Sequence, residues 1–326
     1  MDYRDGIIIG QCFRPDPPSV FAMNALIRSP RTVDFLLIVV ALIWGTSYGV
    51  VKGALLVYPV LGLLALRFGI TFVLLAPALR GLGHVTWRDR LGVVGAGLLL
   101  LGIFLAETFG VSLTSASNAA FLISLCVVLT PLVEWAWLKR APRQVEWMAA
   151  GLSLLGAFLL TGGHFAASPG DLLVILAALL RAVATCAVKR VTKVPPLTIT
   201  AVQSAVVSIG CAALALTFAR DPLLPLPHWH GHGVFWGSMI YLVAGCTLFA
   251  FFVQNYAVSR SSPTRVALLM GSEPLFGALF ACVWLGERLS LPAWLGGMLI
   301  VAASLFALKR EPRVALEEAV KAAAKA

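Results

Sequence analysis

Several ionisable side chains lie inside long apolar stretches of the sequence, where they have the greatest capacity for chemistry. Arg67 and Arg181 supply guanidinium groups, and Glu107 and Glu273 supply carboxyl groups. An ionised side chain at the centre of a bilayer costs about 2.5–3.5 kcal/mol on insertion scales, so it usually faces a cavity or a partner. Because a guanidinium can hold a carboxylate through two parallel hydrogen bonds, Arg67 and Arg181 are candidate sites for a substrate carboxylate.

Each of these residues also has a structural interpretation. An ion pair between Arg67 and Glu107 is as compatible with the sequence as substrate binding is, and Glu107 is also placed to reach the membrane surface. Arg181 lies too deep for its side chain to reach that surface easily. We therefore favour a central cavity for Arg181, with a pair to a glutamate of another helix as the alternative.

Glu273 and Pro274 stand together in the apolar stretch 265–285. A proline inside a helix leaves a carbonyl without its usual donor one turn earlier, here at Met270. A broken helix beside a carboxylate suits a site for a proton or cation. A packing kink that holds the carboxyl group in place is the alternative.

Neutral polar and aromatic residues accompany these charges. Trp44 and Tyr48 are four residues apart and so share a helix face, which we expect to flank the cavity. Gln254 and Asn255 need hydrogen-bond partners in lipid. They are expected either to bind substrate or to bridge two helices.

Glycines recur at every fourth position of the first apolar stretch, at Gly45, Gly49 and Gly53. They share one helix face and permit close approach of a neighbouring helix. Helix packing is the simpler interpretation. The alternative is a sliding surface in which Gly45 and Gly49 take part in gating.

The composition excludes a soluble protein. Apolar residues make up 60% of the 326 residues and charged residues only 12%, with a mean hydropathy of +0.91. The net charge of +10 is divided into short clusters between apolar stretches, a pattern typical of membrane orientation rather than of nucleic-acid binding. Cysteine spacing predicts no metal site, and motifs for ATP binding or enzymatic catalysis are missing. We therefore expect no cofactor, no metal and no enzyme activity.

Ten stretches are long enough to span a bilayer as helices. They lie near residues 34–56, 60–79, 91–110, 117–138, 145–162, 171–190, 197–218, 234–257, 265–285 and 291–308.

The second half of the chain repeats the first. A shift of 137 residues places Asp34 on Asp171, and a shift of 147 places Glu107 on Gln254. Because each copy has five helices, the second must enter the membrane from the opposite side. The predicted fold is an all-α polytopic membrane protein of ten transmembrane helices in two inverted five-helix repeats, an architecture typical of secondary transporters.

The expected division is a disordered tail, two repeats and a second tail: 1–33, 34–162, 163–308 and 309–326. With a cytoplasmic N-terminus, 20 of the 25 Lys and Arg residues fall in inner segments, and only Arg220 and Arg288 fall in outer loops. The excess of positive charge on one side predicts that both termini are cytoplasmic.

Short motifs in both halves resemble the EamA family of the drug/metabolite transporter superfamily across residues 34–308. They are Trp44-Gly-Thr-Ser, Leu66-Arg67-Phe, Thr114-Ser-Ala-Ser-Asn-Ala-Ala-Phe, Gly170-Asp171-Leu-Leu, Glu273-Pro274-Leu-Phe, Leu285-Gly-Glu-Arg-Leu and Trp294-Leu-Gly-Gly. The resemblance implies ten helices and a bacterial inner-membrane exporter or permease for amino acids and related metabolites. Val127 stands where the family often has a proline matching Pro274, so the resemblance does not by itself predict that the two stretches bend alike.

These observations predict a secondary transporter that moves small polar metabolites, amino acids or related organic acids, across the bacterial inner membrane by alternating access, with export expected. Its partners are the substrate and the lipid bilayer. Proton coupling and either a monomer or a homodimer are compatible with the sequence. A cationic drug exporter is one alternative, which Arg67 and Arg181 disfavour by repelling cations. A membrane subunit without transport activity is the other.

Overall fold

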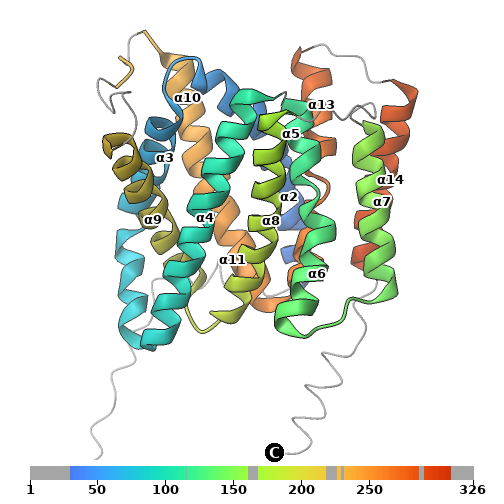
Figure 1. Ribbon diagram of the computed structural model, residues 1–326, viewed down its shortest axis with the longest axis horizontal. Helices are drawn as coiled ribbons and strands as arrows, with labels where there is room; N and C mark the ends of the chain where they lie inside the picture. Colours follow the sequence, from blue (N-terminus) through green and yellow to red (C-terminus); the bar gives the residue numbers. More distant parts are fainter. Residues whose placement is uncertain are drawn as a thin grey trace, which may run out of the picture.

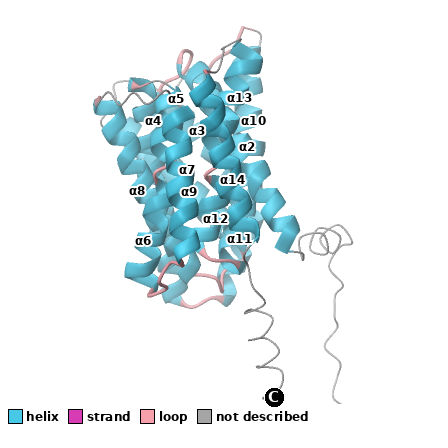
Figure 2. Ribbon diagram, turned by 90° about the vertical axis from the view of Figure 1, so that its right-hand side faces the viewer, coloured by secondary structure: helices cyan, strands magenta, loops and turns pink. Residues whose placement is uncertain are grey.

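The computed structural model describes residues 30–114, 116–160, 168–217, 226–228, 231–285 and 290–309. Every secondary-structure element in these ranges is helical, and the helices pack into one bundle (Figures 1 and 2). A helix satisfies all its backbone hydrogen bonds within one segment, which is what an apolar surrounding demands. The all-α class follows directly from the long apolar stretches.

The described elements of the first half are α2 (Pro30–Leu55), α3 (Val60–Leu75), the 3₁₀ helix η1 (Ala76–His84), α4 (Trp87–Leu113), α5 (Ala116–Ile123), α6 (Cys126–Leu138) and α7 (Gln144–Leu160). Those of the second half are α8 (Pro169–Arg190), α9 (Pro196–Thr217), α10 (Gly233–Tyr241), the π-helix η2 (Leu242–Phe249), α11 (Ala250–Arg260), α12 (Pro263–Met270), α13 (Glu273–Leu285) and α14 (Leu291–Lys309).

Within the described residues, 7 helical stretches are long and apolar enough to cross a membrane. They are Arg31–Leu55, Val60–His84, Trp87–Leu113, Ala119–Leu138, Pro169–Arg190, Pro196–Thr217 and Gly233–Arg260. Two more apolar helices, Gln144–Leu159 and Leu291–Phe306, are shorter, and the stretch 263–285 is divided into α12 and α13. Each predicted stretch falls on a helix or on consecutive helices, but ten crossings remain a prediction.

The division of 263–285 occurs where the sequence places a proline. α12 ends at Met270 and α13 begins at Glu273. Pro274 therefore lies in the first turn of a helix, where its missing N–H group costs little. The hydroxyl of Ser272 donates a hydrogen bond to the carbonyl oxygen of Leu269 at 2.9 Å, a local bond that competes with the helical pattern.

The equivalent stretch of the first half is divided as well. α5 ends at Ile123 and α6 begins at Cys126, although Val127 stands in place of a proline. The hydroxyl of Ser124 donates to the carbonyl oxygen of Phe121 at 2.5 Å. The two halves are thus interrupted alike, with a serine beside each break.

Helix packing is consistent with two related halves. α3 packs against α9, and α7 packs against α14, so helices of equal rank in the two repeats are neighbours. These two pairs lie at opposite edges of the bundle in Figure 1. In the centre, the contact of α2 with α13 is matched by that of α8 with α6. Helices of both repeats therefore surround the space between the two halves.

One glycine of the first helix is required by the contact of α2 with α13. A Cβ atom added at Gly45 would lie 2.9 Å from the backbone nitrogen of Gly277 and 3.0 Å from the Cβ of Phe276. A Cβ at Gly49 would meet only the Cε1 of Phe280 at 3.6 Å, and one at Gly53 would meet nothing within 4 Å. Close packing thus explains Gly45 but not the other two glycines.

The Lys- and Arg-rich connections lie together at one end of the bundle, which we call the basic end. It comprises residues 76–90, 137–143, 189–198 and 260–265. Hydrogen bonds link these segments: Thr198 donates to the carbonyl of Ala78, Arg190 to that of Trp137, and Lys189 to that of Ser261. The common location is the one that the inverted repeats and the charge pattern predict.

Candidate binding cavity between the two halves

A cavity lies between the two halves of the bundle. Side chains of α2, α3, α4, α8, α9, α11 and α13 line it. Its lining includes every charged and polar candidate chosen from the sequence: Arg67, Glu107, Arg181, Glu273, Tyr48, Gln254 and Asn255. Trp44, Phe104 and Phe251 contribute aromatic walls. Pro274, Gly45 and Gly49 do not line it and belong to the helix framework.

Arg181 and Glu273 form a buried ion pair in this cavity. The Nη2 atom of Arg181 lies 3.0 Å from the Oε2 atom of Glu273. The hydroxyl of Tyr48 donates to the other carboxylate oxygen at 2.6 Å. The guanidinium also lies over the ring of Trp44, 4.5 Å from its centre. The sequence offered two interpretations of Arg181, a position in the cavity and an ion pair with a glutamate of another helix. The structure shows both, because the residue lines the cavity and is paired with Glu273.

Trp44 is itself held in place by the π-helix. Its indole nitrogen donates to the carbonyl oxygen of Cys246 at 2.9 Å. π-Helical turns inside longer helices are rare and are frequently found at functional sites. The orientation of Arg181 against Trp44 therefore depends on η2, a feature that hydrophobic periodicity does not reveal.

Arg67 has a different environment. Its Nε atom donates to the hydroxyl of Thr247 at 2.7 Å, and its guanidinium lies over the rings of Phe104 and Phe68, 5.0 and 5.2 Å from their centres. No carboxylate of the described residues lies within ion-pair distance of it. The pair between Arg67 and Glu107, one alternative from the sequence, is not formed.

Glu107 lines the cavity from α4 and is half-buried. In the part of the chain that the structure describes, its carboxylate has no hydrogen-bond or ion-pair partner. Gln254, its equivalent in the second half, also lines the cavity and is half-buried. The two positions thus present a carboxylate and an amide of similar size to the same space.

Asn255 bridges two helices. Its amide nitrogen donates to Thr200 Oγ1 and to Gln203 Oε1 of α9, both at 3.0 Å. The sequence left two roles open for Asn255, substrate binding and a bridge between two helices. The structure shows the bridge. Thr200 and Gln203 were not among the predicted site residues, although their three-residue spacing within 197–218 places them on one helix face.

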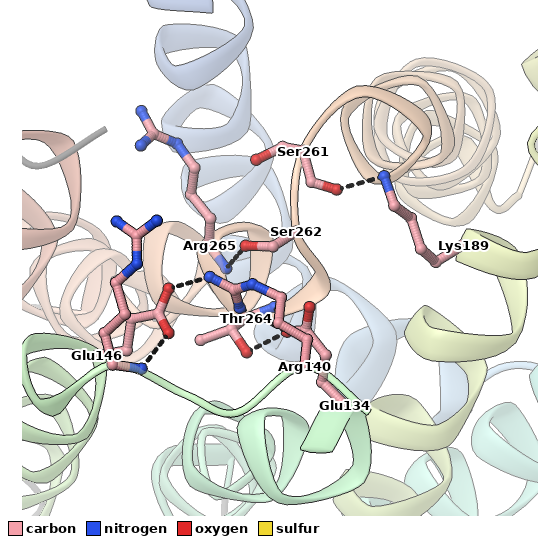
Figure 3. A network of polar contacts seen from close by, with 9 residues as sticks. Glu134, Arg140, Glu146, Lys189, Ser261, Ser262, Thr264 and Arg265 are labelled. Atoms are coloured by element: carbon pink, nitrogen blue, oxygen red, sulfur yellow. Dashed lines mark hydrogen bonds and ion pairs between the residues drawn. The ribbon is translucent and has the colours of Figure 1, made fainter. Parts of the chain in front are cut away.

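A second polar network closes the basic end (Figure 3). Glu134 is 2% exposed; it accepts hydrogen bonds from the backbone nitrogen and the hydroxyl of Thr264 and pairs with Arg140 at 3.2 Å. Asp34 pairs with Arg265 at 2.7 Å. Both sets join the first half of the chain to the second.

Arg140, outside the helices, is held firmly in this network. Partial burial disfavours its charged form, but the hydrogen bond to Glu146 and the charges of Glu134 and Glu146 outweigh that, so the pKa of Arg140 lies above its ordinary value. Its guanidinium therefore stays charged throughout the physiological range.

Buried and half-buried residues alternate along the lining of the cavity. Val188 and Val258, which line it near the basic end, are 4% and 1% exposed, and Val111, near the opposite end, is 2% exposed. Ser47, Val51 and Glu107 are half-buried. Within the described residues, no group of His, Cys, Asp and Glu is arranged to hold a metal ion.

Comparisons with known proteins agree with this arrangement. Residues 31–162 and 168–309 match the model of a family described as the EamA-like transporter family. Two proteins of Archaeoglobus fulgidus, each named an uncharacterized transporter, are 26% and 29% identical to the chain. The alignments cover 83% and 82% of this chain and 83% and 94% of those proteins. A solved crystal structure with 20% identity has a TM-score of 0.70 and covers 86% of this chain and 97% of its own, a likeness that establishes the fold.

Proposed function

Because the chain belongs to the EamA-like transporter family, we propose that it is a secondary transporter for small polar metabolites that carry a carboxylate. The cavity between the two halves is its transport site. The protein lies in the bacterial inner membrane. The charge distribution supports a cytoplasmic position for both termini. Export is the expected direction of transport.

The observation that carries this proposal is the environment of Arg67. Its guanidinium lies in the cavity, hydrogen-bonded to the neutral hydroxyl of Thr247, with no carboxylate of the described residues at ion-pair distance. A buried guanidinium without a counter-charge is costly. A substrate carboxylate supplies that charge, whereas Arg181 already has Glu273 as its partner.

The contacts at the basic end support alternating access. Asp34 with Arg265 and Glu134 with Thr264 join the two halves across one end of the cavity. Transport requires these contacts to separate while others form at the opposite end, a rocking of one repeat against the other. In this structure both contacts at the basic end are formed.

Charge balance disfavours a cationic drug exporter. The cavity holds two arginines and two glutamates, so it has no excess of negative charge when all four are ionised.

Purified protein reconstituted into liposomes tests the function. We expect uptake of labelled carboxylate-bearing metabolites from a panel of amino and organic acids, and a loss of at least about tenfold in Arg67→Gln, the factor that corresponds to one lost charge-assisted contact. Arg88→Gln, which alters an exposed arginine at the basic end, should retain uptake. Transport of the same acids by Arg67→Gln with unchanged apparent affinity would contradict the proposal.

A further inference from the structure

The π-helix η2 contacts both arginines of the cavity, one directly and one through a tryptophan. The hydroxyl of Thr247 accepts a hydrogen bond from the Nε atom of Arg67 at 2.7 Å. The carbonyl oxygen of the preceding residue, Cys246, accepts one at 2.9 Å from Trp44, whose ring lies against the guanidinium of Arg181. Two adjacent residues of η2 therefore help to determine where both guanidinium groups lie.

The backbone hydrogen bonds of η2 differ from those of an α-helix at this point. In an α-helix the amide of Ala250 would donate to the carbonyl of Cys246, four residues earlier. Here it donates to the carbonyl oxygens of Gly245 and Thr247 instead. The carbonyl of Cys246 is not occupied by this amide, and Trp44 donates to it.

The hydroxyl of Thr247 is fixed by its own hydrogen bond within η2. It donates to the carbonyl oxygen of Leu242, five residues earlier, at 2.8 Å. A hydroxyl has one proton and two acceptor lone pairs, so with its proton on Leu242 it meets Arg67 only as an acceptor. Thr247 is 0% exposed, which leaves no surface at which water could compete for this hydroxyl.

The contact with Thr247 occupies one nitrogen of Arg67 and leaves the other two. Neither Nη atom has a hydrogen-bond or ion-pair partner among the described residues. The rings of Phe68 and Phe104 lie against the guanidinium, 5.2 and 5.0 Å from its central carbon to their centres. Because Arg67 lines the cavity, the pair of Nη atoms is the part of it that a ligand can use, and a carboxylate fits such a pair with one oxygen on each nitrogen.

The first half of the chain has no counterpart of this arrangement. A shift of 147 residues places Thr247 on Leu100, within the uninterrupted helix α4. A shift of 137 places Arg67 on Ser204. A contact needed only to build the repeated framework would be expected in both halves, whereas the arginine and its acceptor each occur once.

We infer that Thr247 is a positioning residue, which holds the Nε atom of Arg67 so that both Nη atoms face a ligand carboxylate. This inference rests on the proposed function, because it concerns how the arginine of the transport site is oriented. Bidentate binding of a carboxylate depends on the direction of the guanidinium, so an Arg67 side chain released from Thr247 binds the same carboxylate more weakly. The irregular turn of η2 then has a functional role.

Benzoate and benzamide test this inference on the purified full-length protein, with its arginine Nε atoms isotopically labelled for NMR. The two probes share a ring, but benzoate presents a charged carboxylate with two acceptor oxygens and benzamide a single neutral carbonyl oxygen. The Nε signal of Arg67 is assigned by its loss in Arg67→Lys, and its shift during a titration gives the Kd. We expect benzoate to shift the wild-type signal and benzamide to leave it in place.

Thr247→Val has nearly the same shape as the wild type and removes the acceptor. It should weaken benzoate binding about tenfold, the factor expected for one lost hydrogen bond to a charged group, and speed the exchange of the Arg67 Nε proton with water. Thr247→Ser keeps the hydroxyl and should bind benzoate like the wild type. Thr71→Val is the matched control, because Thr71 is buried in the same helix as Arg67 and donates to the backbone carbonyl of that residue. It should leave the Kd unchanged.

Thr247→Cys is a second variant without a strong acceptor, and it decides the question if Thr247→Val does not fold. The inference is overturned if benzoate does not shift the wild-type signal, or if a folded variant without the acceptor binds benzoate as tightly as the wild type. Liposome uptake separates this result from the proposed function. Full uptake of the acid panel by Arg67→Gln, together with weakened benzoate binding in Thr247→Val, would remove the transport role of Arg67 and leave its positioning by Thr247 standing.

Discussion

The buried contact between Arg181 and Glu273 gives a prediction at the scale of single residues. Glu273→Gln leaves a buried guanidinium without its counter-charge, which typically costs about 3–5 kcal/mol. Tyr48→Phe removes one hydrogen bond to the same carboxylate, and the expected cost is about 1–3 kcal/mol, since the acceptor is charged. Thermal unfolding in detergent should therefore rank Glu273→Gln well below Tyr48→Phe. Equal unfolding temperatures for Glu273→Gln and the wild type would show that the ion pair contributes nothing to stability.

The sequence located the charged residues of the cavity but not their partners. Arg67, Glu107, Arg181 and Glu273 could be chosen because a charge far inside an apolar stretch is costly and therefore informative. Which arginine pairs with which glutamate depends on how helices rotate and pack, so the interaction of Arg181 with Glu273 could not be predicted over that of Arg67 with Glu107. Neutral residues such as Thr247 escaped notice because a hydroxyl in a helix can satisfy itself with a nearby carbonyl.

The contact between α2 and α13 gives a prediction at the scale of elements. A methyl group at Gly45 would meet the backbone of α13, which cannot move like a side chain, so Gly45→Ala should destabilise the protein by about 1–3 kcal/mol. Gly49→Ala is the matched control, because a Cβ there makes only ordinary contact with Phe280. Thermal unfolding of the two variants measures the difference. Similar unfolding temperatures would mean that α2 and α13 do not depend on close approach at Gly45.

At this scale the sequence predicted the positions of the helices and missed their internal irregularities. Apolar length determines where a helix lies, and Pro274 marked the division between α12 and α13 correctly. The break between α5 and α6 has no proline beside it, and the π-helical turns of η2 leave no pattern in hydropathy. Such features depend on local hydrogen bonds, among them the bond from Ser124 to Phe121.

At the scale of the whole molecule, the internal repeat carried most of the functional information. It predicted a binding site between two halves, and a cavity with lining residues from both halves lies there. The sequence could not predict which contacts join the two halves at the basic end, since they connect residues more than 100 positions apart, such as Asp34 with Arg265 and Glu134 with Thr264.

The accessibility of the cavity from each side of the membrane tests the central claim most directly. Gln254 lines the cavity and is half-buried, so a Gln254→Cys variant in a background without the native cysteines reports access to the site. We expect a membrane-impermeant thiol reagent to label it from either side, in right-side-out and in inside-out vesicles, because a transport site opens to both in turn. Labelling from the side of the basic end should be the slower of the two and should become faster in Arg265→Gln. Labelling from one side only, in a variant that still transports, would contradict a transport site in this cavity.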